Sequence, residues 1–141
     1  MTGDPRLATA QLVTISADAD VVRVRQLVRT AAVAVSLSLV DQTKLVTAAS
    51  ELARNTLVYG GGGGAEVEIV DNGRRRGIRI VFSDDGPGIA NLELALTDGY
   101  TSGGGLGLGL GGARRLVDEF EVDTGVGRGT RVTITKWARS M

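Results

Sequence analysis

Two short polar segments constrain the fold of this chain more than any other feature. Glu51-Leu52-Ala53-Arg54-Asn55 lies in a helical pattern, so its carboxylate and its carboxamide are expected on the same helix face. Asp84-Asp85-Gly86-Pro87-Gly88 follows an apolar strand and forms a turn too tight for side chains at its two glycines. A third segment, Gly103-Gly104-Gly105-Leu106-Gly107-Leu108, offers bare backbone that leads into a helix. A carboxylate, an amide and exposed backbone N–H groups suit a magnesium–nucleotide site, and we expect the chain to bind ATP.

The length and the charge balance narrow the class of protein. At 141 residues the chain is expected to fold as a single domain over residues 1–141. A domain of this size buries about 68% of the surface of its unfolded chain. Lysine plus arginine equals aspartate plus glutamate, at 16 each, so no net charge attracts nucleic acid or an anionic membrane.

Two residue types are missing from the sequence. Without cysteine, the chain has no disulfide, no thiol chemistry and no cysteine-based metal site. Without histidine, it cannot use Ser-His-Asp hydrolysis, a histidine base or a phosphohistidine intermediate. No apolar run approaches the ~20 residues of a membrane span, and the first residues lack the apolar core of a signal peptide. We therefore expect a cytoplasmic protein that binds neither nucleic acid nor membrane.

The hydrophobic pattern predicts an α+β fold. Apolar or alternating stretches predict strands over residues 11–16, 65–70, 77–83 and 130–137. Asn72-Gly73 predicts a hairpin turn between the second and third of these strands. Gly127-Arg128-Gly129 predicts a second turn, between the last strand and a strand that precedes it.

Helical spacing of apolar residues predicts the remaining elements. The first helix is expected over residues 20–39, and a second begins at Asp41 as its N-cap. The inner face of the second helix is Leu45, Ala48, Ala49, Leu52 and Thr56. Residues 91–98 predict a short helix. The last helix is expected to bury Leu110, Ala113, Leu116, Val117 and Phe120.

Glycine-rich stretches occur twice. Gly60–Gly64 is expected to end the second helix and then form a loose connection. Gly103–Gly112 lies just before the last helix, where unpaired N–H groups and the helix dipole favour a phosphate. This stretch is not a Walker loop, since it has no lysine, and it does not follow the first strand of a dinucleotide-binding unit.

The side chains of the two polar segments each allow an ordinary and a functional interpretation. Glu51 and Asn55 would ordinarily belong to a solvated helix face. Their apolar neighbours, and the poor helix propensity of asparagine, favour Asn55 as an oxygen ligand of Mg²⁺ alongside phosphates. Glu51 would then accept a proton from a hydroxyl or water that attacks the γ-phosphate. Asp84 could simply open a turn, or it could accept a hydrogen bond from the adenine amino group.

Four ordered motifs resemble the N, G1, G2 and G3 elements of the GHKL ATPase superfamily, which includes gyrase and histidine kinases and has the Bergerat fold. They are Glu51…Asn55, Asp84-x-Gly86-x-Gly88, Gly103-x-Gly105-Leu106-Gly107-Leu108 and Gly127-x-Gly129-Thr130. The resemblance covers nearly the whole chain. It implies a two-layer α/β sandwich, in which helices cover one face of a mixed, mostly antiparallel sheet and nucleotide lies under a flexible lid.

The resemblance also implies the roles of individual residues. Asn55 would bind Mg²⁺, Asp84 would contact adenine, Gly103 to Gly109 would surround the phosphates, and Thr130 would contact the base pocket. The full set of nucleotide-binding residues is Asn55, Asp84, Gly86, Gly88, Ile89, Gly103, Gly104, Gly105, Leu106, Gly107, Leu108, Gly109 and Thr130. Glu51 is the expected catalytic residue, and ATP and Mg²⁺ are the expected cofactors.

Size and the absence of histidine select a branch of the superfamily. Sensor histidine kinases need a histidine, and the topoisomerase, chaperone and mismatch-repair members need further domains. The chain most resembles the small serine/threonine kinases of bacterial partner-switching modules, and among them the stressosome switch kinases, in residues 50–55, 98–104, 115–120 and 135–137. That family phosphorylates STAS-domain antagonist and scaffold proteins. Once released, such a kinase activates a PP2C-type phosphatase.

Two alternatives remain open from the sequence. An anti-sigma factor of the same fold, which sequesters a sigma factor, would carry much the same ATP motifs. A degenerate domain would bind nucleotide without turnover, although the presence of both Glu51 and Asn55 argues against it. We also expect one surface to serve two partners in turn. The candidate residues for that surface are 91–102, including Tyr100.

Overall fold

The centre of the fold is a five-stranded sheet with the strand order β1-β2-β3-β5-β4. The computed structural model describes residues 10–96 and 109–139. Its strands are β1 (Gln11–Ile15), β2 (Gly63–Asp71), β3 (Arg76–Asp84), β4 (Glu119–Gly125) and β5 (Gly129–Trp137). Every pairing among these strands is antiparallel, whereas the sequence had suggested a mixed, mostly antiparallel sheet.

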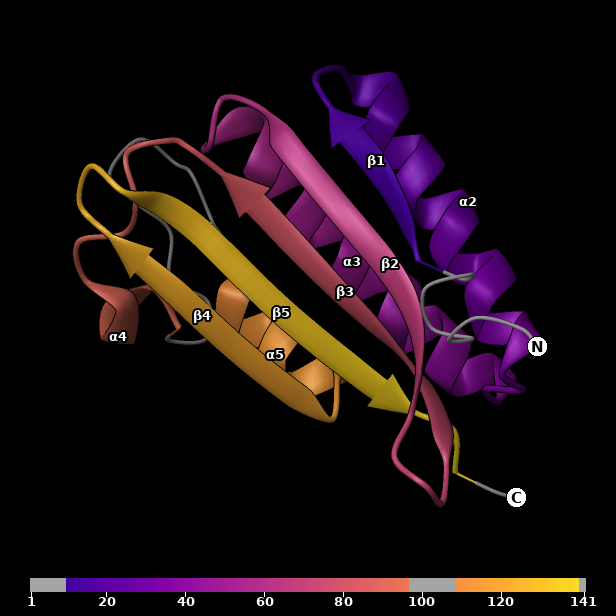
Figure 1. The fold of residues 1–141 in the computed structure, drawn as a ribbon. Coiled ribbons are helices and arrows are strands. Elements are labelled where there is room, and N and C mark those ends of the chain that lie inside the picture. Colours follow the sequence, from indigo (N-terminus) through magenta and orange to yellow (C-terminus); the bar gives the residue numbers. More distant parts are fainter. Residues whose placement is uncertain (1–9, 97–108, 140–141) are drawn as a thin grey trace.

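The helices lie on one face of this sheet, as Figure 1 shows for the three longest. They are α2 (Asp18–Ala34), α3 (Leu39–Val58), α4 (Leu92–Ala95) and α5 (Leu110–Leu116). The two-layer α/β sandwich predicted from the sequence is therefore confirmed. Within the described residues, no helix is long and apolar enough to cross a lipid bilayer.

The core lies between the sheet and the helices. Strand β3 places Ile78, Ile80 and Phe82 on the helical side, and all three are almost fully buried. The alternation of side chains along a strand explains why Arg79 between them points to the exposed face. From the other layer, the predicted inner face of α3 packs onto this surface. The hydrophobic core thus fixes α3, which carries the Glu51–Asn55 segment, against the middle of the sheet.

Three predicted boundaries are wrong. The N-cap of α3 is Ser38, whose hydroxyl accepts a hydrogen bond from the Asp41 amide at 3.1 Å, so Asp41 lies inside the first turn. Helix α2 ends at Ala34, and Ser36 adopts a positive φ of 64° that a helix cannot accommodate. Phe120 belongs to β4, because α5 ends at Leu116.

Both predicted turns are present. The β2–β3 hairpin turns at residues 72–75, where the Asn72 side chain accepts hydrogen bonds from the Arg74 and Arg75 amides at 2.9 and 2.8 Å. The β4–β5 hairpin turns at Gly125–Gly129. In Figure 1 this second hairpin lies at the end of the sheet that also carries α4.

Candidate functional site

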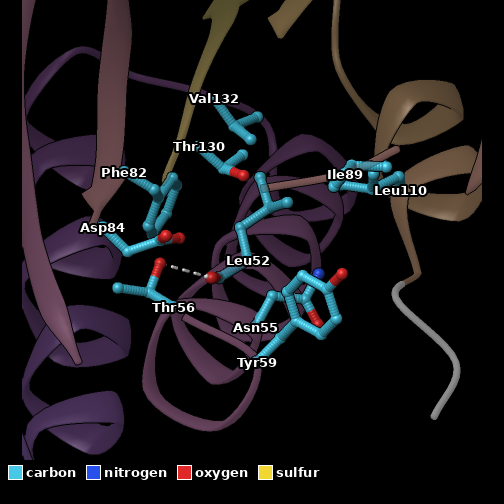
Figure 2. A pocket seen from close by; sticks show the side chains of 10 residues that line it. All are labelled: Leu52, Asn55, Thr56, Tyr59, Phe82, Asp84, Ile89, Leu110, Thr130 and Val132. Atoms are coloured by element: carbon cyan, nitrogen blue, oxygen red, sulfur yellow. Dashed lines mark hydrogen bonds between the residues drawn. The ribbon is translucent and has the colours of Figure 1, made fainter. Parts of the chain in front are cut away.

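A pocket opens between α3, the end of β3, the start of β5 and the start of α5. Figure 2 shows the ten residues that line it: Leu52, Asn55, Thr56, Tyr59, Phe82, Asp84, Ile89, Leu110, Thr130 and Val132. Most of these side chains are apolar, and the polar groups come from a few positions on different elements. An apolar cavity with a few convergent polar groups is typical of a small-molecule site.

Helix α3 supplies one wall of the pocket through residues spaced three or four apart. Asn55 is half-buried and lines the pocket, as its place in the N motif predicted. Glu51, one turn earlier on the same face, is exposed and lies beside the start of α5. Leu110, the first residue of that helix, is preceded by the N-cap Gly109, whose φ is +67°, and a Cβ on Gly109 would overlap the Glu51 carboxylate. Glu51 therefore lies at the rim of the site and not among its apolar walls.

Asp84 ends β3 with its carboxylate in the pocket wall (Figure 2). Its Oδ1 atom accepts a hydrogen bond from the Gly86 amide at 2.9 Å, so the residue does open a turn, as its ordinary interpretation predicted. Burial raises the pKa of the Asp84 carboxyl and the charge of Asp85 adds to this, while the amides of Gly86 and Thr130 act in the opposite direction. Without a ligand, the hydrogen bonds from the two amides therefore do not fully offset the cost of burying the charged Asp84 carboxylate.

The glycines around Asp84 allow segments of backbone to pack closely. A Cβ on Gly60 would overlap the Asp84 carboxyl, and a Cβ on Gly86 would lie 2.7 Å from the Gly60 Cα. Gly88 has a φ of +76°, and a Cβ there would overlap the Gly125 carbonyl. The prediction of a loose connection over residues 60–64 is therefore wrong. Gly60 packs against Asp84, and Gly63 already belongs to β2.

Two residues that the sequence analysis missed join these segments by hydrogen bonds. The Tyr59 hydroxyl donates to the Gly88 carbonyl at 2.9 Å. The Thr124 hydroxyl accepts from the Ile89 amide at 2.9 Å and donates to the Gly129 carbonyl at 3.0 Å. Tyr59 could have been found, because it lies four residues after Asn55 and so on the same helix face. Nothing in the local sequence marks Thr124.

Thr124 also determines whether the Thr130 hydroxyl donates or accepts in the hydrogen bond between them. The two hydroxyl oxygens, of Thr124 and Thr130, are 2.9 Å apart. A hydroxyl has one proton, and Thr124 gives its own to the Gly129 carbonyl, so Thr130 is the donor in this pair. Thr130 then offers only lone pairs to the pocket. Together with the Asp84 carboxylate, it makes this end of the site an acceptor of hydrogen bonds.

The structure brings together four of the predicted nucleotide-binding residues: Asn55, Asp84, Ile89 and Thr130 all line one pocket. Gly86 and Gly88 lie in the loop between Asp84 and Ile89, and Gly109 is the N-cap of α5. The predicted phosphate-binding residues Gly103, Gly104, Gly105, Leu106, Gly107 and Leu108 lie outside the described residues. Tyr100 and the others from 97 to 102 also lie outside them.

The oxygen atoms of the site suit a metal ion that is bound partly by the protein and partly by the phosphates of a nucleotide. In residues 10–96 and 109–139, no three His, Cys, Asp or Glu side chains are grouped as a metal site. Mg²⁺ prefers oxygen ligands and often takes only one or two from the protein, the others coming from phosphates and water. Asn55, at the pocket wall, has an amide oxygen that could serve as such a ligand.

Comparison with known proteins gives three concordant findings. Residues 40–140 match the model of the histidine kinase-, DNA gyrase B- and HSP90-like ATPases. The chain is 41% identical over 127 residues to the serine/threonine-protein kinase RsbT of Bacillus subtilis (strain 168), covering 90% of this chain and 96% of that protein. It is 32% identical over 104 residues to the anti-sigma F factor of Clostridium novyi (strain NT), covering 70% of this chain and 73% of the relative.

A solved structure shares the fold at lower identity. It contains the RsbU and RsbW domains of a Mycobacterium tuberculosis protein, with a TM-score of 0.62 and 20% sequence identity. The match covers 93% of this chain and 33% of that longer one. At this identity the likeness supports the fold alone.

Proposed function

The chain belongs to the histidine kinase-, DNA gyrase B- and HSP90-like ATPase family and is a serine/threonine protein kinase, and we propose that it acts on STAS-domain proteins. These would be the antagonist and scaffold proteins of a cytoplasmic partner-switching module, such as a stressosome. The observation that carries the proposal is the 41% identity to a serine/threonine-protein kinase over nearly its full length. The pocket supports it, because it gathers Asn55, Asp84 and Thr130 from three elements.

Within this proposal the pocket binds the adenine end of ATP. Asp84 accepts a hydrogen bond from the adenine amino group, and Thr130 presents its lone pairs at the same end of the site. Leu52, Phe82 and Val132 provide the apolar surroundings of the base. Asn55 holds Mg²⁺ together with the phosphates, and bound Mg²⁺ supplies positive charge that offsets theirs. The glycine-rich segment 103–109 provides backbone N–H groups for the phosphates.

Glu51 is the proposed general base. Its carboxylate would accept the proton of the substrate hydroxyl as that oxygen attacks the γ-phosphate. The acceptor residue belongs to another protein and must reach the reacting phosphate from outside. An exposed carboxylate at the rim, one helical turn from Asn55, fits this requirement.

Asp84→Asn is expected to weaken ATP binding and at the same time to stabilise the free protein at neutral pH. Loss of a buried polar contact costs about 1–3 kcal/mol, so affinity should fall roughly five- to 150-fold. The raised pKa of Asp84 means that folding without ligand is favoured below pH 3.8 and penalised as the pH rises through the folded pKa. Asparagine removes that penalty and keeps an oxygen for the Gly86 amide. Titration with ATP and chemical denaturation measure the two effects.

The same geometry predicts that the wild type prefers ATP to GTP. Guanine presents a carbonyl where adenine has its amino group, and Asp84 and Thr130 offer that position only acceptors. Asp85→Asn is the control, since it removes an adjacent carboxylate that does not line the pocket. Comparable affinity for GTP, or equal effects of the two aspartate variants, would contradict the adenine contact.

We expect the kinase to bind its substrate and its phosphatase at one surface, in turn. Phosphorylation adds close to two negative charges to the STAS surface and should weaken that complex. In a mixture of the three proteins, STAS protein and a PP2C-type phosphatase should compete for the kinase. ATP should shift the competition toward the phosphatase. A stable ternary complex in size-exclusion chromatography would rule out the shared surface.

Glu51→Gln separates phosphate transfer from partner exchange in that experiment. Phosphatase activation should need no phosphate transfer, so the variant should activate the phosphatase when no STAS protein is present. It should also compete like wild type in the absence of ATP. ATP should shift the competition toward the phosphatase with the wild-type kinase and not with Glu51→Gln. A shift with both proteins would show that phosphate transfer does not drive the exchange of partners.

A second candidate function is that of an anti-sigma factor. The 32% identity to an anti-sigma F factor over 70% of this chain favours it. The two candidates differ in what the purified chain retains: a sigma factor in one case, and STAS protein together with a phosphatase in the other. Phosphate transfer to the STAS protein, without retention of a sigma factor, would select the kinase of a phosphatase pathway.

A further inference from the structure

One peptide group in the loop after β3 is held at both of its polar atoms. The Gly88 carbonyl accepts from the Tyr59 hydroxyl at 2.9 Å, and the Ile89 amide donates to the Thr124 hydroxyl at 2.9 Å. These two backbone atoms belong to the same peptide plane. Their partners come from opposite sides: Tyr59 from the end of α3 and Thr124 from the edge strand β4.

The neighbouring contacts bind the same loop to the β4–β5 hairpin. The Gly127 amide donates to the Pro87 carbonyl at 2.9 Å. Gly88 packs directly on the Gly125 carbonyl, in a left-handed conformation that glycine leaves at little cost. Because glycine alone does not fix this conformation, the two hydrogen bonds help to fix the orientation of the peptide.

The peptide matters because it determines where the next side chain points. Ile89 follows directly and lines the pocket beside Leu110 in Figure 2. We propose that Tyr59 and Thr124 are positioning residues that fix the Gly88–Ile89 peptide and thereby hold Ile89 in the wall of the base pocket. The inference rests on the proposed function, in which this pocket holds adenine.

The geometry also predicts how the two residues combine. Rotation of one peptide plane breaks both hydrogen bonds together, so after loss of one partner the other still opposes the same motion. The effect of removing both should then differ from the product of the single effects, as is usual for residues that share one partner. Within the described residues no hydrogen bond or ion pair joins either residue to Glu51, so the chemical step should be spared.

The test uses Tyr59→Phe, Thr124→Val and the double variant of the full chain. Amide hydrogen exchange at Ile89, measured without nucleotide, should speed up in Tyr59→Phe although that substitution does not touch the Ile89 amide. Tyr59→Phe should bind ATP about fivefold more weakly, as expected for one hydrogen bond. Thr124→Val should weaken binding at least as much, because it also removes the bonds to the Gly129 carbonyl and the Thr130 hydroxyl, and the double effect should differ from the product. The KM for ATP should rise by a similar factor, with kcat nearly unchanged.

Two controls separate positioning from general destabilisation. Thr124→Ser keeps the hydroxyl and should bind ATP like wild type. Thr133→Val makes the same substitution on the outer face of the sheet and should leave both ATP affinity and Ile89 exchange unchanged. Unchanged Ile89 exchange in Tyr59→Phe would overturn the inference, as would a double effect equal to the product.

The failure of this inference is distinguishable from failure of the proposed function. Faster Ile89 exchange with unaltered ATP affinity, while Asp84→Asn binds weakly, would overturn the positioning role and leave the pocket assignment intact. ATP binding that no pocket variant changes would overturn both.

Discussion

Glu51→Gln is expected to slow phosphate transfer by about 10²–10⁴-fold and to leave the affinity for ATP nearly unchanged. Glutamine keeps the size of the side chain and removes its ability to accept a proton. Asn55→Ala and Asn55→Asp should instead weaken Mg²⁺-dependent ATP binding and abolish transfer. Binding is measured by titration with ATP in the presence and absence of Mg²⁺, and transfer by single-turnover phosphorylation of the STAS substrate.

The position of Glu51 beside the first turn of α5 calls for a control on folding. A carboxylate near a helix N-terminus contributes about 0.3–1 kcal/mol at most exposed sites, so the free energy of unfolding should change little. Glu66→Gln, on the exposed side of β2, is the matched variant and should affect neither transfer nor binding. Equal losses of ATP affinity in the Glu51 and Asn55 variants would show that the two roles are wrongly divided.

Periodic features of the sequence predicted the fold well. The inner face of α3 and the inward positions Val132 and Ile134 of β5 follow from the repeat of each element, and the structure buries them. The strict alternation predicted for β5 does not hold at its end, where Thr135 and Lys136 are buried as well.

The helical spacing also placed Glu51 and Asn55 on one helix face. The family motifs predicted that Asp84 and Thr130 meet in one pocket. Motifs in this order along the chain imply the fold of the family, and that fold brings the two residues together.

Features that depend on tertiary contact could not be predicted. Thr124 is unremarkable in its own strand, and its role arises only because β4 lies beside the loop after β3. Asp41 resembles an N-cap, since aspartate commonly caps helices, yet Ser38 caps α3. The Asp41 carboxylate interacts instead with residues almost a hundred positions away in the sequence.

Asp41 belongs to an ion cluster at the start of α3, in which Asp41 and Lys136 are buried. The Lys136 ammonium lies 3.6 Å from Asp41 Oδ1 and 3.4 Å from Asp118 Oδ1, and its side chain is only 3% exposed. Arg139 donates to Asp41 Oδ2 at 3.0 Å. The cluster joins the first turn of α3 to the end of β5 and so helps to fix the helix that carries Glu51 and Asn55.

Lys136→Met is expected to destabilise the fold by about 3–5 kcal/mol at neutral pH, because it leaves the buried Asp41 carboxylate without the adjacent ammonium group. Burial alone would raise the pKa of Asp41, but the hydrogen bond from Arg139 and the charge of Lys136 hold it below 3.8. Stabilisation of this kind is fully present above pH 3.8 and is lost as the pH falls through the folded pKa. Wild type and variant should therefore converge in stability at acid pH.

Chemical denaturation at a series of pH values measures both parts of this prediction. Lys44→Met makes the same substitution on α3, outside the cluster, and surface changes of that kind usually stay within about 0.5 kcal/mol. A Lys136→Met variant as stable as Lys44→Met would show that the attraction within the cluster only offsets the cost of burying its charges. A large destabilisation that does not diminish with acid would instead point to lost packing of the lysine stem.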